Sequence, residues 1–256
     1  NMKVIVLGAT GATGRLVVKE LLTQQHQVIA LVRSSGQEHT LKKIDEDLRE
    51  EGLGNEELRD EEQLTLINGT ALTLEDAHLS KLIDKADGVI SCLGHNLTWR
   101  GIYGAPQMMV RDSIKRILTL ACPQRKAPLK LVLMNSSGVR NKDQHEPISL
   151  MQRIVLTILR LLLPPHKDNE QAANYLRTLD ASKHTTQWVV VRPDALIDHC
   201  NATPYSLHPA PIRSAIFDAG KVSRINVAVA MTRLLSDSHL WEKWQGKMPL
   251  IYNSEE

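Results

Sequence analysis

The chain has 256 residues, 42% of them hydrophobic, and a formal net charge of +2. This length can bury a substantial core, and we expect residues 1–256 to form a single domain. The balanced charge argues against nucleic acid or an anionic membrane as the main partner. Three scattered cysteines favour reduced thiols in the cytoplasm over a disulfide framework or a zinc site. No signal peptide is expected, and Asn1 before Met2 is interpreted as a residue left by tag removal.

The first predicted element is a β-branched strand at 4–7 that leads directly into a glycine-rich turn. An amphipathic helical pattern begins at once, over residues 15–22. Glycine in such a turn lets backbone N–H groups approach a pyrophosphate, and the helix N-terminus adds unpaired donors and a partial positive charge. The alternative is a tight strand–helix turn without a ligand. We predict that a dinucleotide contacts Gly8, Thr10, Gly11, Ala12, Thr13 and Gly14.

The second predicted strand covers 27–32 and ends at Arg33 and Ser34. NAD sites usually place a carboxylate here, which accepts hydrogen bonds from the ribose 2′-hydroxyl. A guanidinium instead clamps the 2′-phosphate of NADP by charge-assisted hydrogen bonds and stacks on adenine. We therefore expect NADP rather than NAD, with Arg33 and Ser34 as contacts. The alternative is an exposed arginine that only ends a strand.

Charged residues dominate residues 36–63, which we interpret as a solvated insertion with one helix from 40 to 51 and then a mobile loop. We do not expect a functional site there. Further strands are predicted at 64–67, 89–92 and 129–134, and helices at 74–82 and from Pro106 to Ala121.

Residues 148–163 form the most apolar segment, and their polar side chains fall three or four apart on one helical stripe. The segment is shorter than the roughly 20 residues that a membrane span needs, and it carries two arginines. We predict a buried helix or one that packs in a homodimer, with no membrane span. Pro164-Pro165 are expected to end it, before a second helix at 168–179.

The last third of the chain begins with a strand at 188–191 that is closed by Arg192-Pro193. A proline-rich loop on the substrate side follows at 199–222. Ser223 is predicted to cap a helix, and 250–252 to form a late edge strand. His199 and Cys200 are adjacent but lack further ligand spacing, so no metal site is expected.

Strands interleaved with helices predict a Rossmann-type doubly wound parallel sheet, with helices on both faces and a small C-terminal extension. Right-handed crossovers place the carboxyl ends of all parallel strands on one side. The loops that follow the strands are therefore expected to converge on one crevice. These loops carry Gly8–Gly14, Arg33, Gly94, Ser136 and Pro193.

The chain resembles the atypical short-chain dehydrogenase/reductase superfamily, in particular its NmrA-like and biliverdin/flavin-reductase-like branch. The resemblance is carried by residues 8–14, 31–33, 91–94, 135–138 and 191–193. It implies that the first loop holds the pyrophosphate, that the loop after the fourth strand passes the adenine and ribose, and that the loop after the fifth faces the nicotinamide. Leu93, Gly94 and Pro193 are accordingly expected beside the cofactor.

The chain departs from this pattern in its proton relay. Extended members of the superfamily use a Ser and a Tyr-x-x-x-Lys, but Leu163 stands four residues before the candidate Lys167. The acidic residue usual after the third strand is also missing, since that turn reads Asn68-Gly69-Thr70. Ser136 and Lys167 remain as catalytic candidates: Ser136 for a substrate carbonyl, Lys167 for the nicotinamide ribose. The alternatives are a serine that closes a turn and a solvated lysine.

These features favour an NADPH-dependent oxidoreductase that delivers hydride to a small carbonyl, quinone or flavin-like acceptor. Hydride transfer to an easily reduced acceptor needs little acid–base help from the protein. A second hypothesis is a non-catalytic NADP-binding redox sensor or assembly factor. A third, a nucleotide-sugar epimerase or dehydratase, lacks an identifiable base.

Overall fold

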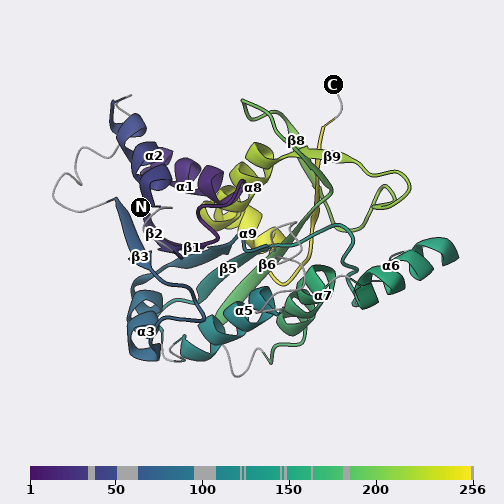
Figure 1. Cartoon of the computed structure of the whole chain (residues 1–256), viewed down its shortest axis with the longest axis horizontal. Coiled ribbons are helices and arrows are strands. Elements are labelled where there is room, and N and C mark those ends of the chain that lie inside the picture. Colours follow the sequence, from purple (N-terminus) through teal and green to yellow (C-terminus); the bar gives the residue numbers. More distant parts are fainter. Residues whose placement is uncertain are drawn as a thin grey trace.

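The computed structural model describes residues 1–33, 38–50, 63–94, 108–121, 123, 125–144, 146, 149–162, 164–180 and 185–254. In these ranges eight strands form one sheet, in the order β3-β2-β1-β4-β5-β6-β10-β8 (Figure 1). The strands are β1 (Lys3–Leu7), β2 (Gln27–Val32), β3 (Leu64–Asn68), β4 (Gly88–Ser91), β5 (Leu129–Met134), β6 (Thr186–Pro193), β8 (Tyr205–His208) and β10 (Leu250–Asn253).

Every pairing from β3 across to β10 is parallel, and only β8 runs antiparallel to its neighbour β10. The chain runs from β1 outward to β2 and β3, and then crosses to the other side of β1 to form β4. This reversal creates a topological switch point between β1 and β4, where open α/β sheets bind ligands. The predicted doubly wound fold is confirmed.

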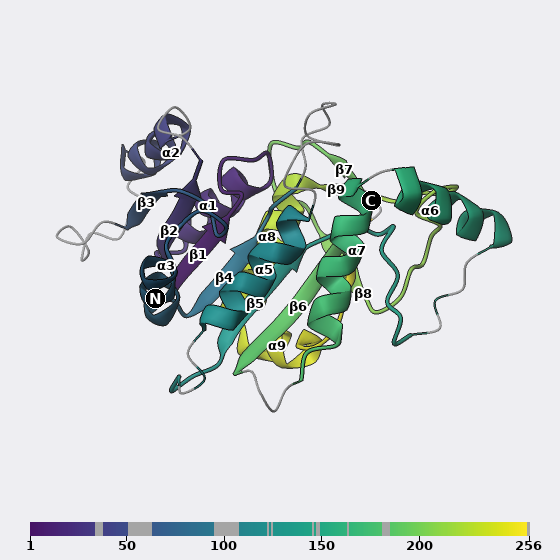
Figure 2. The same cartoon turned by 60° about the horizontal axis from the view of Figure 1, so that its bottom comes forward.

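Helices cover both faces of the sheet (Figure 2), because alternate strand residues are apolar on both sides. Val4 and Val6 join the core on one face, and Ile5 and Leu7 join the core on the other. The first face packs against α1 (Gly14–Thr23), α2 (Glu38–Glu50), α8 (Arg224–Ser236) and α9 (Ser238–Trp244), and the second against α3 (Asp76–Lys85), α5 (Met109–Leu120) and α7 (Pro164–Arg177).

Helix α6 (Leu150–Leu162) projects beyond the edge of this layered body in both views (Figures 1 and 2). Residues 148 and 163, the ends of the predicted apolar helix, lie outside the described residues. No helix in the described ranges combines the length and apolar character needed to cross a bilayer.

Pro164 and Pro165 begin α7, whereas the sequence pattern predicted a helix only from Asp168. Proline is well tolerated in the first helical turn, where its missing N–H has no intrahelical partner to lose. The predicted helix start at Asp168 was therefore four residues late, while α6 does end before the prolines.

The C-terminal region adds more strands than predicted. β8 lies within the segment predicted as a proline-rich loop, and β9 (Lys221–Ser223) pairs there with β7 (Ala195–Ile197) in a small parallel sheet. β10 was predicted as an edge strand, but it lies between β6 and β8, which takes the edge instead. Helix α8 does begin after Ser223, whose hydroxyl accepts a hydrogen bond from the Asn226 N–H at 3.2 Å.

An ion pair buried in the protein interior links distant parts of this region. The side chains of Arg192 on β6 and Glu146 are 0% and 1% exposed. Arg192 Nη2 lies 2.7 Å from Glu146 Oε1, and Nη1 lies 3.1 Å from Oε2. The guanidinium also donates to the carbonyls of Val139, at 2.9 Å, and Met248, at 2.8 Å. The connection after β5 is thereby tied to β6 and to the chain that enters β10.

Removing one member of this pair leaves the charge of the other buried without its partner. We expect Glu146→Ala to lower the free energy of unfolding by about 3–5 kcal/mol, measured by urea denaturation. Asp198→Ala is the matched control, since it breaks the Arg224–Asp198 pair, whose aspartate is 86% exposed; its cost should stay below about 1 kcal/mol. Equal losses for the two variants would contradict a structural role for the buried pair.

Candidate functional site

A pocket of about 400 Å³ opens at the switch point between β1 and β4. It is formed by the carboxyl ends of β1, β2 and β4, the turn after β3 and the first turns of α5. The residues that line it are Leu7, Gly8, Thr10, Gly11, Leu31, Arg33, Thr70, Ala71, Leu72, Thr73, Cys92, Leu93, Gly94, Met109 and Ser113.

Two glycines of the first turn are required by the packing of the chain itself. Gly8 has φ +71°, and a Cβ there would lie 2.7 Å from the Cys92 carbonyl oxygen. A Cβ on Gly14 would lie 1.9 Å from the Gly8 carbonyl oxygen. Side chains at either position would therefore push β1, β4 and α1 apart.

Gly11 differs from these two glycines. It is exposed on the pocket wall, and a Cβ there would meet only the Gly8 carbonyl oxygen, at 3.3 Å. Its own N–H donates to that oxygen at 3.0 Å and closes the turn. A side chain at Gly11 would require only a small shift of the Gly8 carbonyl. The missing side chain mainly leaves the surface of the pocket open for a ligand.

The N-terminus of α1 follows this turn directly, at Gly14. Thr13 occupies the N-cap position, but its side chain makes no capping hydrogen bond. Ala12 is exposed beside it, and Thr13 is 4% exposed. The N–H groups of Arg15 and Leu16 donate to the carbonyls of Gly11 and Thr13, each at 3.0 Å. The start of the helix carries a partial positive charge, which suits an anion.

The far end of the pocket is formed by residues that follow β2 and β3. Arg33 is exposed and lines it directly after β2; Ser34 lies outside the described residues. Thr70 and Thr73 form a compact turn, in which the Thr70 N–H donates to Thr73 Oγ1 at 2.8 Å. The sequence had shown only that an acidic residue is missing here, whereas the structure shows two hydroxyl groups in its place.

Cys92 contributes a thiol to the pocket wall but is not suited to act as a nucleophile. It follows β4 and is buried. Burial raises the pKa of its thiol to about 12, because desolvation disfavours the thiolate. Cys92 therefore remains a neutral, largely apolar group at physiological pH. Leu93 and Gly94, predicted from the family resemblance, follow it on the same wall.

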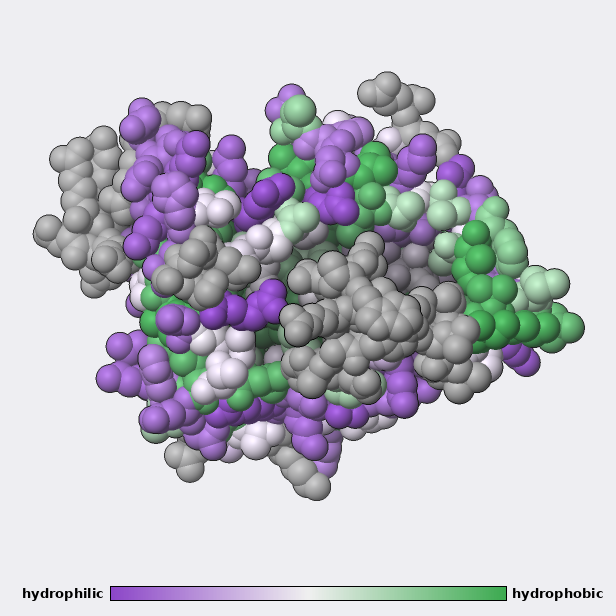
Figure 3. Space-filling model, viewed as in Figure 1, coloured by the Kyte–Doolittle hydropathy of each residue, from purple (hydrophilic) through white to green (hydrophobic). Residues whose placement is uncertain are grey.

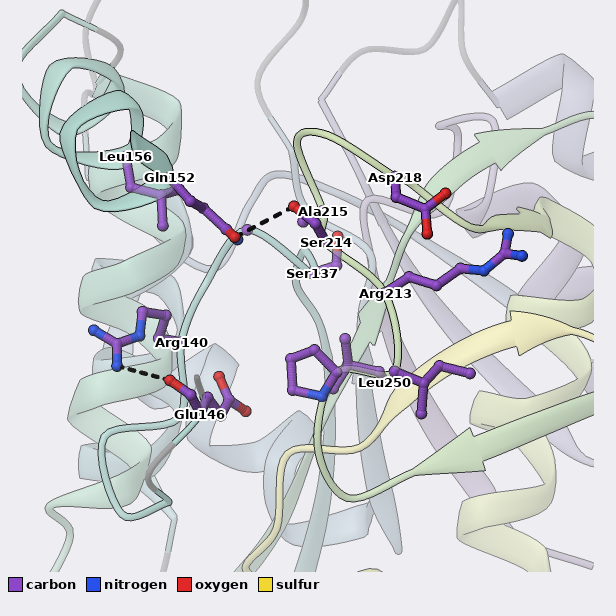
Figure 4. A pocket seen from close by; sticks show the side chains of 13 residues that line it. Ser137, Arg140, Glu146, Gln152, Leu156, Arg213, Ser214, Ala215, Asp218 and Leu250 are labelled. Atoms are coloured by element: carbon purple, nitrogen blue, oxygen red, sulfur yellow. Dashed lines mark hydrogen bonds between the residues drawn. The ribbon is translucent and has the colours of Figure 1, made fainter. Parts of the chain in front are cut away.

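A second pocket, of about 310 Å³, lies between α6 and the segment 211–218 (Figure 4). Its rim is held by two hydrogen bonds, from Ser214 Oγ to Gln152 Oε1 at 3.2 Å and from Arg140 Nη2 to the Glu146 carbonyl at 3.2 Å. Sequence reasoning missed this pocket, because its wall joins segments far apart in the chain. It is lined by Ser137, Gly138, Arg140, Glu146, Gln152, Leu156, Pro211, Ile212, Arg213, Ser214, Ala215, Asp218 and Leu250.

Six described residues of the predicted site line neither pocket: Ala12, Thr13 and Gly14 in the first turn, and Ser136, Lys167 and Pro193 farther along the chain. Ser136 follows β5, where its Oγ accepts a hydrogen bond from the Gly138 N–H at 3.3 Å. Lys167 is exposed on the first turns of α7. Pro193 is buried at the end of β6, and its carbonyl accepts from the Ser137 N–H at 2.9 Å. The expected single crevice is thus represented by two pockets with different linings.

A carboxylate lies at the end of β6, beside the second pocket. Asp194 is 7% exposed and accepts hydrogen bonds from Ser137 Oγ at 3.0 Å and from the Gly220 N–H at 2.8 Å. It fixes the position of the turn after β5 relative to the strand that follows. This acceptor follows directly on Arg192-Pro193, which the sequence analysis had interpreted only as a strand ending.

A second buried carboxylate belongs to α7. Asp168 is 0% exposed, and its two oxygens accept the N–H groups of Val110, at 2.8 Å, and Arg111, at 2.9 Å. These amides form the N-terminus of α5, so Asp168 caps one helix from another. Its neighbour Lys167, by contrast, points to solvent.

Within the ranges that the structure describes, no group of three or more His, Cys, Asp or Glu side chains could hold a metal ion. His199 and Cys200 lie in this part of the chain and are both exposed.

The geometry agrees with the comparisons with known proteins. A family model described as NAD(P)H-binding matches residues 8–238. A short-chain dehydrogenase/reductase from Veillonella parvula in complex with NADP superposes with a TM-score of 0.64 at 17% identity, over 98% of this chain and 94% of that one. No curated protein sequence matches.

Two further solved structures share the fold. A candidate NADH-flavin reductase from Streptococcus pneumoniae has a TM-score of 0.63 at 17% identity, with 99% of this chain and 100% of that one covered. An anaerobilin reductase from Escherichia coli has a TM-score of 0.65 at 14% identity, with 99% and 98% covered. The predicted resemblance to short-chain dehydrogenases and flavin or biliverdin reductases is thereby confirmed.

The two kinds of glycine should respond differently to a methyl group. We expect Gly14→Ala to destabilise the fold by more than about 2 kcal/mol, because the new Cβ collides with backbone. Gly11→Ala should cost less than about 1 kcal/mol but weaken NADPH binding at least tenfold. Thermal melting and cofactor fluorescence measure the two effects. An intact NADPH affinity in Gly11→Ala would show that no ligand lies against Gly11.

Proposed function

The chain belongs to the NAD(P)H-binding family, and we propose on this premise that it is an NADPH-dependent oxidoreductase. Its proposed acceptor is a small carbonyl, a quinone or a flavin-like molecule. The observation that carries the proposal is the first pocket, which joins the glycine turn that leads into α1 and Arg33 at the topological switch point of the sheet.

The residues of this pocket suit a dinucleotide. Exposed Gly11 leaves room beside the start of α1, where the amides favour a pyrophosphate. A Cβ on Gly94 would meet no atom within 4 Å, so this wall is also open. We propose that Gly8, Thr10, Gly11, Ala12, Thr13 and Gly14 hold the pyrophosphate and that Leu93 and Gly94 flank the adenosine portion.

Arg33 supports NADP over NAD. Its guanidinium sits at the end of β2 on the pocket wall, and the structure shows no carboxylate among the lining residues of this pocket. A ribose 2′-hydroxyl would find no acidic acceptor among them, whereas a 2′-phosphate would gain a charge-assisted, bidentate partner. We propose that Arg33, with Ser34 beside it in the chain, selects NADP.

The bound cofactor would supply a hydride, so the protein's task is to place the acceptor and stabilise the charge that develops on it. Ser136 Oγ accepts the Gly138 N–H, which leaves the hydroxyl proton for donation to an acceptor oxygen. Lys167 and Pro193 are proposed to approach the nicotinamide end, and the second pocket, lined by part of 199–222, to receive the acceptor.

A second candidate is a non-catalytic NADP-binding sensor or assembly factor. It is favoured by the missing Tyr-x-x-x-Lys and by Lys167, which is exposed on α7 and is not among the residues that line the first pocket. An epimerase or dehydratase is a weaker candidate, because it needs a base that neither pocket supplies in an evident arrangement.

Turnover separates these candidates. We expect purified protein to oxidise NADPH in the presence of flavins, quinones or small carbonyls, followed by absorbance at the reduced nicotinamide band. Ser136→Ala should slow kcat and leave the NADPH dissociation constant unchanged. Tight NADPH binding without oxidation across the whole panel would favour the sensor, and absence of NADPH binding would refute both.

Cofactor preference tests Arg33. We expect Arg33→Ala to weaken NADPH binding about tenfold to a hundredfold, since a hydrogen bond to a charged group contributes about 1.5–3 kcal/mol. NADH binding should stay within about twofold, because NADH lacks the 2′-phosphate. Lys115 is exposed on α5 and does not line the pocket, so Lys115→Ala, which removes the same charge, is the matched control. An equal loss for both nucleotides in Arg33→Ala would contradict this role.

A further inference from the structure

The apolar residues that the fold leaves uncovered are gathered in one region. Six large hydrophobic residues are exposed in the described part of the chain, and they occur on only two segments. Four belong to α6, with 73, 59, 48 and 47% exposed, and two to the segment 211–217, with 60 and 58% exposed. In that order they are Leu150, Met151, Ile154, Ile158, Ile212 and Phe217, which we call the apolar surface.

The two segments lie side by side. Gln152 on α6 accepts a hydrogen bond from Ser214 at 3.2 Å, and Leu156 and Ile212 line the same pocket between them (Figure 4). In the space-filling view the hydrophobic colour collects over the projecting α6 (Figure 3). Four large apolar side chains exposed on one short helix favour a partner surface.

Helix α6 is amphipathic in a particular way. Leu150, Ile154 and Ile158 recur at intervals of four and share one exposed stripe. Arg153 and Thr157 are exposed on the adjacent stripe, while Gln152 and Leu156 face the body. An exposed apolar stripe flanked by arginine, on a helix too short to span a bilayer, is the pattern of helices that lie in a membrane surface.

The charge of α6 favours a membrane over a second copy of the chain as the partner of the apolar surface. Residues 149–162 contain Arg153 and Arg160 and no Asp or Glu, whereas residues 211–218 contain Arg213 and Asp218, whose charges cancel. A symmetric dimer would place the same basic surface on both sides of its interface. Anionic lipid headgroups would complement that charge, and their acyl chains would receive the apolar residues.

We propose that the apolar surface docks this protein on an anionic membrane surface. The helix lies in the plane of the interface, with its apolar stripe toward the acyl chains and Arg153 at headgroup level. The net charge of +2 conceals this site, because acidic residues elsewhere in the chain balance its basic ones. The proposal does not depend on the cofactor or on turnover.

Vesicle flotation of the 256-residue chain tests the proposal. We expect recovery with phosphatidylcholine vesicles that contain phosphatidylglycerol and little recovery with phosphatidylcholine alone. Ile154→Ser with Ile158→Ser should abolish recovery, and Arg153→Glu should weaken it by about fivefold for each unit of charge changed. Lys115→Glu makes the same charge change at an exposed position of α5 and should have little effect.

Melting temperature and NADPH affinity, measured on each variant, show whether the fold and the first pocket are intact. Equal recovery with neutral and anionic vesicles, or an equal loss in Lys115→Glu, would overturn the proposal. It would also fall if sedimentation equilibrium showed a dimer that the double serine variant dissociates, because the apolar surface would then be an interface between two copies.

Discussion

The buried ion pair between Arg192 and Glu146 constrains much of the C-terminal half of the molecule. A guanidinium at the end of an interior strand costs a large desolvation penalty unless a carboxylate and carbonyl oxygens surround it. Glu146 and the Val139 carbonyl come from the connection after β5, and the Met248 carbonyl comes from the chain that enters β10, so both are held against β6. Glu146 also lines the second pocket, so the ion pair fixes part of its wall.

The N-terminal half could be predicted from the sequence because its signals are local. A β-branched run, three glycines and an amphipathic helix lie within twenty residues, and Gly8 and Gly14 are demanded by contacts between neighbouring elements. Arg33 follows its strand directly, so the continuous apolar run of β2 was enough to place it at the carboxyl edge of the sheet. Thr70 and Thr73 were missed because a hydroxyl turn has no strong sequence signature.

The C-terminal half could not be predicted in the same way, because its structure depends on contacts across the chain. The position of β10 near the end of the sequence predicts an edge strand. In the structure β8 pairs with β10 on its outer side in antiparallel register, and no local sequence pattern predicts this pairing. Pro164 ends one helix and begins the next, and proline permits both. The second pocket joins residues from 137 to 250, and average charge conceals the basic, apolar character of α6.

The capping of α5 by Asp168 has a consequence for how a nucleotide is oriented. α1 and α5 both start at the carboxyl edge of the sheet; α5 borders the first pocket, and α1 begins three residues after Gly11, which lines it. The start of α5 already holds a carboxylate, so its positive end is neutralised from within the fold. In the described part of the chain, the start of α1 holds no such carboxylate. Under the proposed binding mode the diphosphate therefore has one favoured end of the pocket, and a dinucleotide inserted the other way round would meet no comparable field.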